Sequence, residues 1–327
     1  MSAHTSVLLD ETANALLNQP ADQARVFIDA TFGRGGHSRY LLSKMSPLDT
    51  LIVIDKDPEA IAVATLLSQD DPRLKVFHGS FAQIDIALAR FGFSEADGIM
   101  ADLGVSSPQL DVAARGFSFQ SAGPIDMRMD SSKGETASDL IERLSSEELA
   151  DVLYEFGEER HSRRIARAIK DAWPLTTTLE LGEVIKAAHP KWEKRIHPAT
   201  KSFQGLRIKV NNELGDIDAL LDQALIRLKS GGVLAVISFH SLEDRRVKHF
   251  MQKHSGGALP EGDPWGAPMP KLLTKPARIK ASEAEVKDNP RSRSAWLRVS
   301  RRSAVPLLTS LEVSGDDAAD GLAKVGI

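Results

Sequence analysis

Short apolar segments alternate with helix-like segments through the first hundred residues of the chain. Apolar runs lie at residues 26–30, 51–55, 74–77 and 96–101, and a helical pattern or a turn follows each of them. Pro58 stands where it can open one of these helices, because the first helical position does not need an N–H. Short buried strands separated by helices are typical of a parallel sheet that is covered on both faces. The sequence therefore predicts an α/β, doubly wound fold.

This alternation stops in the middle of the chain. From about Val105 to Leu206 the sequence is polar and helix-rich. A Ser-x-x-Glu capping box at Ser145 indicates the start of one helix, and another is expected over residues 158–172. The strand–helix pattern resumes near Glu213. We predict one sheet domain with a helical insertion, divided as follows: residues 1–105, first part of the sheet domain; 106–206, insertion for substrate recognition; 207–302, second part; 303–327, a flexible tail. Within the second part, strands are expected at 233–239, 271–275 and 295–299, with a loop at 258–270.

The chain contains no cysteine. Disulfide scaffolds, cysteine-ligated zinc sites, iron–sulfur clusters and thiolate nucleophiles are thereby excluded. The nine histidines lack the spacing of a zinc site, so no metal is expected. No apolar run reaches the roughly 18 residues that span a membrane, and the first ten residues do not resemble a signal peptide. These features predict a cytoplasmic protein with no membrane contact.

Basic residues are concentrated in two stretches of a chain whose net charge is −4. Residues 186–209 hold seven Lys and Arg against one acid, and residues 271–302 hold ten against three. Local patches of this kind allow a mildly acidic protein to hold phosphate groups.

A Gly-rich turn follows the first predicted strand, with Gly33, Gly35, Gly36 and His37 in succession along it. Such a turn lets the backbone approach a bound nucleotide closely, and Asp55, at the end of the next strand, is placed to accept hydrogen bonds from ribose hydroxyls. A structural turn and an NAD site are the alternatives. The third glycine of the dinucleotide-binding pattern is missing, which counts against NAD.

A second polar segment, Asp102 to Gln109, follows the fourth predicted strand. Ligands of open α/β sheets bind at the carboxyl ends of the strands, where this segment is expected to lie. Its alternative is an Asx turn closed by Pro108. The run from Ser238 to Asp244 has the composition of a Ser/His/Asp hydrolase, but the strand–turn–helix motif that presents such a serine is absent.

Arginines cluster in the predicted helix over residues 158–172, at positions 160, 163, 164 and 167. Arginine suits phosphate by charge and geometry. A solvated outer face, partly balanced by Glu158 and Glu159, is the alternative interpretation.

Several motifs together resemble the bacterial ribosomal small subunit methyltransferase H family, also called MraW, from about His4 to Arg302. They are HTSVLL from His4, DATFGRGGHS from Asp29, DLGVSSPQLD from Asp102, RGFSF from Arg115, DMRMD from Asp126, GEERHSRRIAR from Gly157, HPATKSFQ from His197, SFHSLEDR from Ser238 and NPRSRS from Asn289. Ile125 and Lys201 depart from the residues that are common in the family.

The resemblance implies a class I (Rossmann-like) S-adenosylmethionine-dependent methyltransferase domain with an inserted helical domain. The implied reaction methylates the 4-amino group of a cytidine in 16S rRNA of the small ribosomal subunit. Cofactor binding would fall on Gly35, Gly36, His37, Asp55, Phe81, Asp102 and Gln109. RNA contacts are assigned to Arg160, Arg163, Arg164, Arg167, Lys201, Arg291 and Arg293. Monomer and homodimer are both left open.

The chemistry requires acceptors for the N–H groups of a weakly nucleophilic amine, and close alignment with the methyl donor. We assign this role to Asp102 and to the turn formed by Ser106, Ser107 and Pro108. Methylation of the cytosine ring at carbon 5 ordinarily needs a cysteine, which this chain lacks. An NAD-dependent oxidoreductase and a non-catalytic RNA-binding module are the competing functions.

Overall fold

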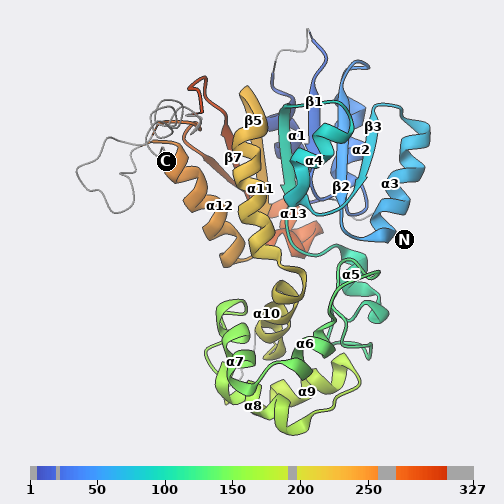
Figure 1. Cartoon of the computed structure of the whole chain (residues 1–327), viewed down its shortest axis with the longest axis vertical. Coiled ribbons are helices and arrows are strands. Elements are labelled where there is room, and N and C mark those ends of the chain that lie inside the picture. Colours follow the sequence, from blue (N-terminus) through green and yellow to red (C-terminus); the bar gives the residue numbers. More distant parts are fainter. Residues whose placement is uncertain (1–5, 20–22, 191–196, 257–269, 308–327) are drawn as a thin grey trace, which may run out of the picture.

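A computed structural model describes residues 6–19, 23–190, 197–256 and 270–307. Its centre is a seven-stranded sheet in the order β3-β2-β1-β4-β5-β7-β6 (Figure 1). The strands are β1 (Val26–Asp29), β2 (Thr50–Asp55), β3 (Leu74–His78), β4 (Ala96–Asp102), β5 (Leu228–Ser238), β6 (Ala277–Lys280) and β7 (Trp296–Arg301). Pairs among β1 to β5 are parallel, whereas β7 runs antiparallel to β5 and β6.

Helices cover both faces of this sheet, as expected for its largely buried inner strands, β1, β2, β4 and β5. One face packs against α1 (Leu9–Leu17), α2 (Gly36–Lys44), α3 (Pro58–Asp70) and α13 (Glu283–Asp288). The other packs against α4 (Ile84–Arg90), α11 (Glu213–Arg227) and α12 (Ser241–His254). Two short 3₁₀ turns lie against these helices: η1 (Phe81–Gln83) contacts α11, and η3 (Pro290–Ser294) contacts α13. The expected Rossmann-like α/β sheet, covered by helices on both faces, is confirmed.

Between β4 and α11 the described residues form helices and no strand. These are α5 (Ser107–Asp111), η2 (Ala113–Arg115), α6 (Ala137–Arg143), α7 (Ser146–Glu155), α8 (Ser162–Ala172), α9 (Thr178–Ala188) and α10 (Ala199–Asn211). Helices α6 to α10 bury their own apolar core, which includes Leu140, Leu153, Ile165, Leu181 and Phe203. Figure 1 shows this helical group beyond the carboxyl edge of the sheet. The predicted boundary at residues 206–207 lies inside α10.

Two sequence expectations were wrong in detail. The helix expected over residues 158–172 begins only at Ser162. Glu158 has a left-handed backbone conformation, with φ 52°, so it cannot belong to the helix. No strand forms at 271–275, where Leu273 makes an isolated bridge to Arg302, and the edge strand is β6 instead. The edge strand lacks a clear hydrophobic pattern because most of its residues are exposed. Most of the loop expected at 258–270 and residues 308–327 of the expected flexible tail lie outside the described residues.

Candidate active site

The Gly-rich turn joins β1 to α2 at the carboxyl edge of the sheet. Gly33 and Gly35 have φ angles of 56° and 77°, in the left-handed region that favours glycine. A Cβ atom on Gly35 would lie 2.6 Å from the ring of Phe32, so only glycine fits there without a shift. The turn therefore brings bare backbone to the edge of the sheet.

Asp55, the last residue of β2, fixes this turn from the side. Its Oδ2 accepts a hydrogen bond of 2.7 Å from the Gly33 N–H, and its Oδ1 accepts one of 2.8 Å from the Asp57 N–H. Burial raises the pKa of Asp55 to about 6. A carboxylate oxygen has two lone pairs, so both oxygens can still accept bonds from a ligand.

Asp102, at the end of β4, lies beside the same turn. Its backbone N–H donates to Thr31 Oγ1 at 2.6 Å, and its Oδ2 lies 3.7 Å from His37 Nδ1. Within the described part of the chain its Oδ1 is buried without a hydrogen-bond partner. Burial raises the pKa of Asp102 to about 6, an effect that His37 opposes and that Asp29 and Glu243 reinforce. A buried acceptor without a partner is suited to a ligand that carries donors or positive charge.

The turn after β4 is shaped by Gly104 and by a helix cap. Gly104 has φ 96°, and Ser106 then caps the short helix α5. Gln109 Oε1 accepts the Ser106 N–H at 2.9 Å, which closes the capping box. The turn therefore holds a fixed shape at the sheet edge.

These segments surround one cavity of about 320 Å³. The predicted residues on its wall are Gly36, His37, Asp55, Phe81, Asp102, Ser106, Ser107, Pro108, Gln109 and Arg291. Gly35 belongs to the same turn but does not line the cavity. The structure thus brings together all four predicted catalytic residues and six of the seven predicted cofactor residues.

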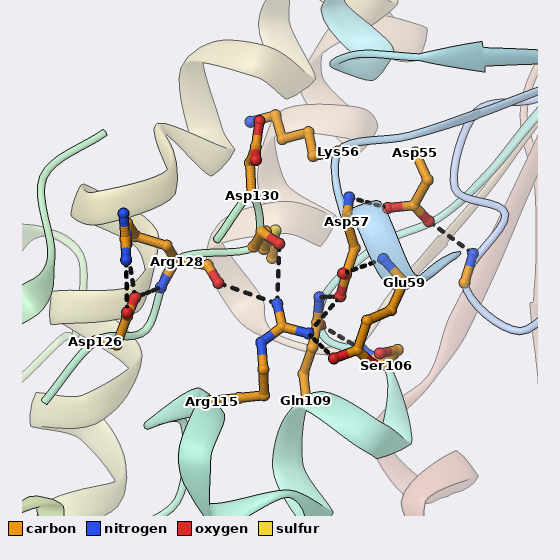
Figure 2. A network of polar contacts seen from close by, with 12 residues as sticks. Asp55, Lys56, Asp57, Glu59, Ser106, Gln109, Arg115, Asp126, Arg128 and Asp130 are labelled. Atoms are coloured by element: carbon orange, nitrogen blue, oxygen red, sulfur yellow. Dashed lines mark hydrogen bonds and ion pairs between the residues drawn. The ribbon is translucent and has the colours of Figure 1, made fainter. Parts of the chain in front are cut away.

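A polar network next to the cavity contains residues that the sequence did not single out (Figure 2). Asp57 and Arg115 are both buried and form an ion pair of 2.7 Å. Two signals were present in the sequence, since Asp57 stands in the preferred N-cap position before Pro58 and Arg115 begins the RGFSF motif. Neither signal shows that these two residues form a pair.

The cavity is also bounded by a segment near the N-terminus. Ser6 and Val7 lie on its wall, and the carbonyl oxygen of Val7 is 3.0 Å from His37 Nε2. The next N–H, that of Leu8, donates to Glu285 Oε1 of α13 at 2.7 Å. The segment that follows Ser6 and Val7 is therefore joined to α13 next to the cavity wall.

The predicted RNA-binding residues do not form one group. Arg160, Arg163, Arg164 and Arg167 are exposed on and just before α8, and none of their side chains makes a hydrogen bond or an ion pair within the described ranges. The acids expected to balance them point elsewhere: Glu158 pairs with Arg245, and Glu159 is buried and accepts the His161 N–H.

The remaining three basic residues lie apart from α8. Lys201 is exposed and donates to the carbonyl oxygen of Glu158 at 3.2 Å. Arg291 lies at the cavity, where its guanidinium donates to Ser107 Oγ and pairs with Asp111 at 3.0 Å. Arg293 is exposed on the same 3₁₀ turn, η3. Only Arg291 is therefore close to the predicted catalytic turn.

Among the residues that the structure describes, no three His, Asp or Glu side chains gather as ligands of a metal ion. No described helix combines the length and the apolar character that crossing a membrane requires.

Comparison with known proteins gives a consistent result over almost the whole chain. A sequence model described as the MraW methylase family matches residues 1–303. Proteins named ribosomal RNA small subunit methyltransferase H are similar at high identity. The one from Psychrobacter arcticus is 52% identical and covers 94% of this chain and 97% of its own. That from Acinetobacter baumannii is 56% identical, covering 92% and 98%, and one from a further Psychrobacter species is 56% identical, covering 94% and 93%.

Proposed function

This chain belongs to the MraW methylase family, and from that premise we propose that it transfers a methyl group from S-adenosylmethionine to the 4-amino group of a cytidine in 16S rRNA of the small ribosomal subunit. The observation that carries the proposal is the buried Oδ1 of Asp102, an acceptor without a partner among the described residues, at a cavity between the Gly-rich turn and the Ser106–Pro108 turn. The oxidoreductase alternative has no support in a family of methylases.

The residues around the cavity fit S-adenosylmethionine. The volume of about 320 Å³ lies within the range of ligand pockets. Asp55 would accept the ribose hydroxyls, Phe81 would lie beside the adenine, and Asp102 would hold the amino group of the methionine part. The Gly-rich turn would supply backbone contacts through Gly36. When bound, the cofactor supplies a methyl group on a positively charged sulfur.

The protein's task in the reaction is to align and to accept hydrogen bonds. The lone pair of the cytosine amine is delocalised into the ring, so proximity to the methyl donor provides much of the acceleration. Asp102 and the carbonyl groups of the Ser106–Pro108 turn would accept the amine N–H groups as positive charge develops on nitrogen. No covalent activation of the ring is needed, in agreement with a chain that has no cysteine.

Exposed basic side chains are the proposed RNA contacts. Arg160, Arg163, Arg164 and Arg167 present four guanidinium groups without acidic partners in the described ranges, and such groups bind phosphates. Lys201, Arg291 and Arg293 would add contacts, and Arg291 would lie nearest to the target base. The base must leave its stack to reach the cavity. A substrate within the ribosomal small subunit would place the protein in the cytoplasm.

The test is the chemical identity of the product. Purified protein is incubated with labelled S-adenosylmethionine and small subunits, and the RNA is digested to nucleosides. Chromatography with mass fragmentation separates N(4)-methylcytidine from its 5-methyl isomer. We expect only the N(4) isomer, because addition to the ring would need a nucleophile that the chain lacks. Detection of 5-methylcytidine would overturn the proposed mechanism.

A further inference from the structure

Asp57 lies at a junction between two walls of the cavity. It is 5% exposed at the N-terminus of α3, where its Oδ1 accepts the Glu59 N–H at 3.0 Å. Its Oδ2 accepts two further bonds, one of 3.0 Å from Gln109 Nε2 and one of 2.7 Å from Arg115 Nη1 (Figure 2). The loop after β2 is therefore joined to the turn after β4 through a single oxygen atom.

Arg115 joins a third segment to the same point. Its guanidinium is almost buried, and Nη2 donates to the carbonyl oxygens of Arg128 at 3.2 Å and Met129 at 2.9 Å. Met129 also lines the cavity, and its N–H donates to Asn211 Oδ1 at 2.7 Å. The planar guanidinium bonds in three directions at once, which a lysine ammonium on a flexible stem cannot reproduce.

Gln109 links Asp57 to the predicted catalytic turn. Its side chain is 5% exposed, with Nε2 bonded to Asp57 and Oε1 accepting the Ser106 N–H at 2.9 Å. Both ends of the amide are therefore engaged inside the protein. Gln109 was predicted to bind the cofactor, but the contacts described here connect it to the backbone of Ser106.

We propose that Arg115 is a positioning residue for methyl transfer, acting through Asp57 and Gln109 on the Ser106–Pro108 turn. This inference rests on the proposed function, since the turn is the proposed acceptor of the amine N–H groups. A shift of about 1 Å in a reacting group can slow a reaction by about a hundredfold. A loose turn would thus reduce the rate of transfer while the Gly-rich turn and Asp55, on the other wall, still hold the cofactor.

The test compares Arg115→Lys with the native enzyme in three measurements. These are single-turnover methylation of small subunits at saturating cofactor, cofactor affinity by calorimetry, and melting temperature. We expect the rate to fall by roughly a hundredfold and the dissociation constant to change by less than about threefold, well under the tenfold that 1.4 kcal/mol represents. Arg73→Lys is the matched control, because Arg73 also bonds to one aspartate, Asp71, and to backbone carbonyls, but lies before β3. It should lower the melting temperature without slowing transfer.

A second variant tests the path of the effect. Gln109→Met removes the amide but keeps the buried pair of Asp57 and Arg115. If Arg115 acts through Gln109, the Gln109→Met protein should be slow, and adding Arg115→Lys should slow it by less than about threefold more, since coupled residues are not additive. This variant also decides the matter if Arg115→Lys fails to fold.

Several outcomes would overturn the inference. They are a native rate in folded Arg115→Lys, a native rate in Gln109→Met, independent effects in the double variant, or parallel losses of rate and cofactor affinity. The native enzyme keeps this test separate from the proposed function. If native protein does not methylate small subunits, the proposed function fails. If it does, and Arg115→Lys equals it, only the positioning role fails.

Discussion

We expect Asp102 to make cofactor binding depend on pH. Burial raises the pKa of its carboxyl to about 6, and the charges of Asp29 and Glu243 act in the same direction. Below pH 6 the carboxyl holds a proton and loses the charge that would attract an amino group. At pH 5 about one tenth of the molecules would keep the charge, so we expect affinity for S-adenosylmethionine to be about tenfold weaker than its plateau above pH 7. Calorimetry over this range measures the effect.

Asp102→Asn is the matched variant for this measurement. It keeps the size of the side chain but has no carboxyl to titrate at this position, so its affinity should be low and should depend on pH less than that of the native protein. Asp55 also has a pKa of about 6 and can contribute a smaller slope. If the variant retained the full native dependence, Asp102 would not be the titrating group that holds the cofactor.

The sequence indicated some residues of the site but not others. Asp55 and Asp102 could be placed because each follows an apolar run, and the ends of parallel strands meet at one edge of the sheet. The contact between Asp57 and Arg115 spans 58 residues, and it depends on how the chain turns after α5. No local pattern encodes that turn. Whether Asp102 Oδ1 has a hydrogen-bond partner likewise depends on which neighbouring groups are already bonded.

Helix α8 is the element best suited to test RNA binding. Its arginines lack acidic partners in the described ranges, whereas the two neighbouring glutamates are engaged elsewhere. Arg163→Glu combined with Arg164→Glu should weaken association with small subunits and reduce the slope of log affinity against log salt by about 2, since each lost phosphate contact removes about 0.9. Affinity for S-adenosylmethionine should not change.

The control for this charge reversal is Arg90→Glu with Lys44→Glu. Both residues are exposed at the C-terminal ends of α4 and α2, which lie at the amino edge of the sheet. The control makes the same change in net charge far from the helical group, so it should leave the salt slope almost native. An unchanged slope in the α8 variant would mean that this face is only solvated.

Elements with strong local signals were found from the sequence with small errors at their ends. Helix α7 begins at its Ser145 capping box, α3 begins at Pro58, and the inner strands lie where the apolar runs indicate. The first helix, α1, and the edge strand β6 were not identified. Strand β6 is exposed along most of its length, so burial imposes little pattern on it. Its position is set by pairing with β7, a contact beyond the reach of local periodicity.

At the scale of the whole molecule, not every cation of the two basic stretches is exposed. In the second stretch, Arg298 is buried against Asp244, and Arg302 is buried with bonds to backbone carbonyls. Such side chains hold the sheet edge together and are not exposed to phosphate. Most exposed cations of the second stretch lie on and before β6 and on η3, in the sheet domain, whereas those of α8 lie in the helical group (Figure 1).

Separate contacts on a molecule of net charge −4 suit a shaped surface better than an unfolded polyanion. We therefore expect efficient methylation of an assembled or nearly assembled small subunit and poor methylation of protein-free 16S rRNA. Initial rates with the two substrates, at equal RNA concentration and ionic strength, measure the difference. Equal rates on free RNA would contradict a requirement for the assembled shape.

The closure of the cavity has a consequence for the order in which the protein becomes functional during translation. Glu285, whose Oε1 accepts the N–H of Leu8, is synthesised 277 residues after Leu8. At a synthesis rate of about 5–20 residues per second, this interval is roughly 15–55 s. Arg291, which binds Ser107, arrives later still. We therefore expect a nascent chain to carry its Gly-rich turn and Asp102 well before Arg291 is available to complete the cavity wall.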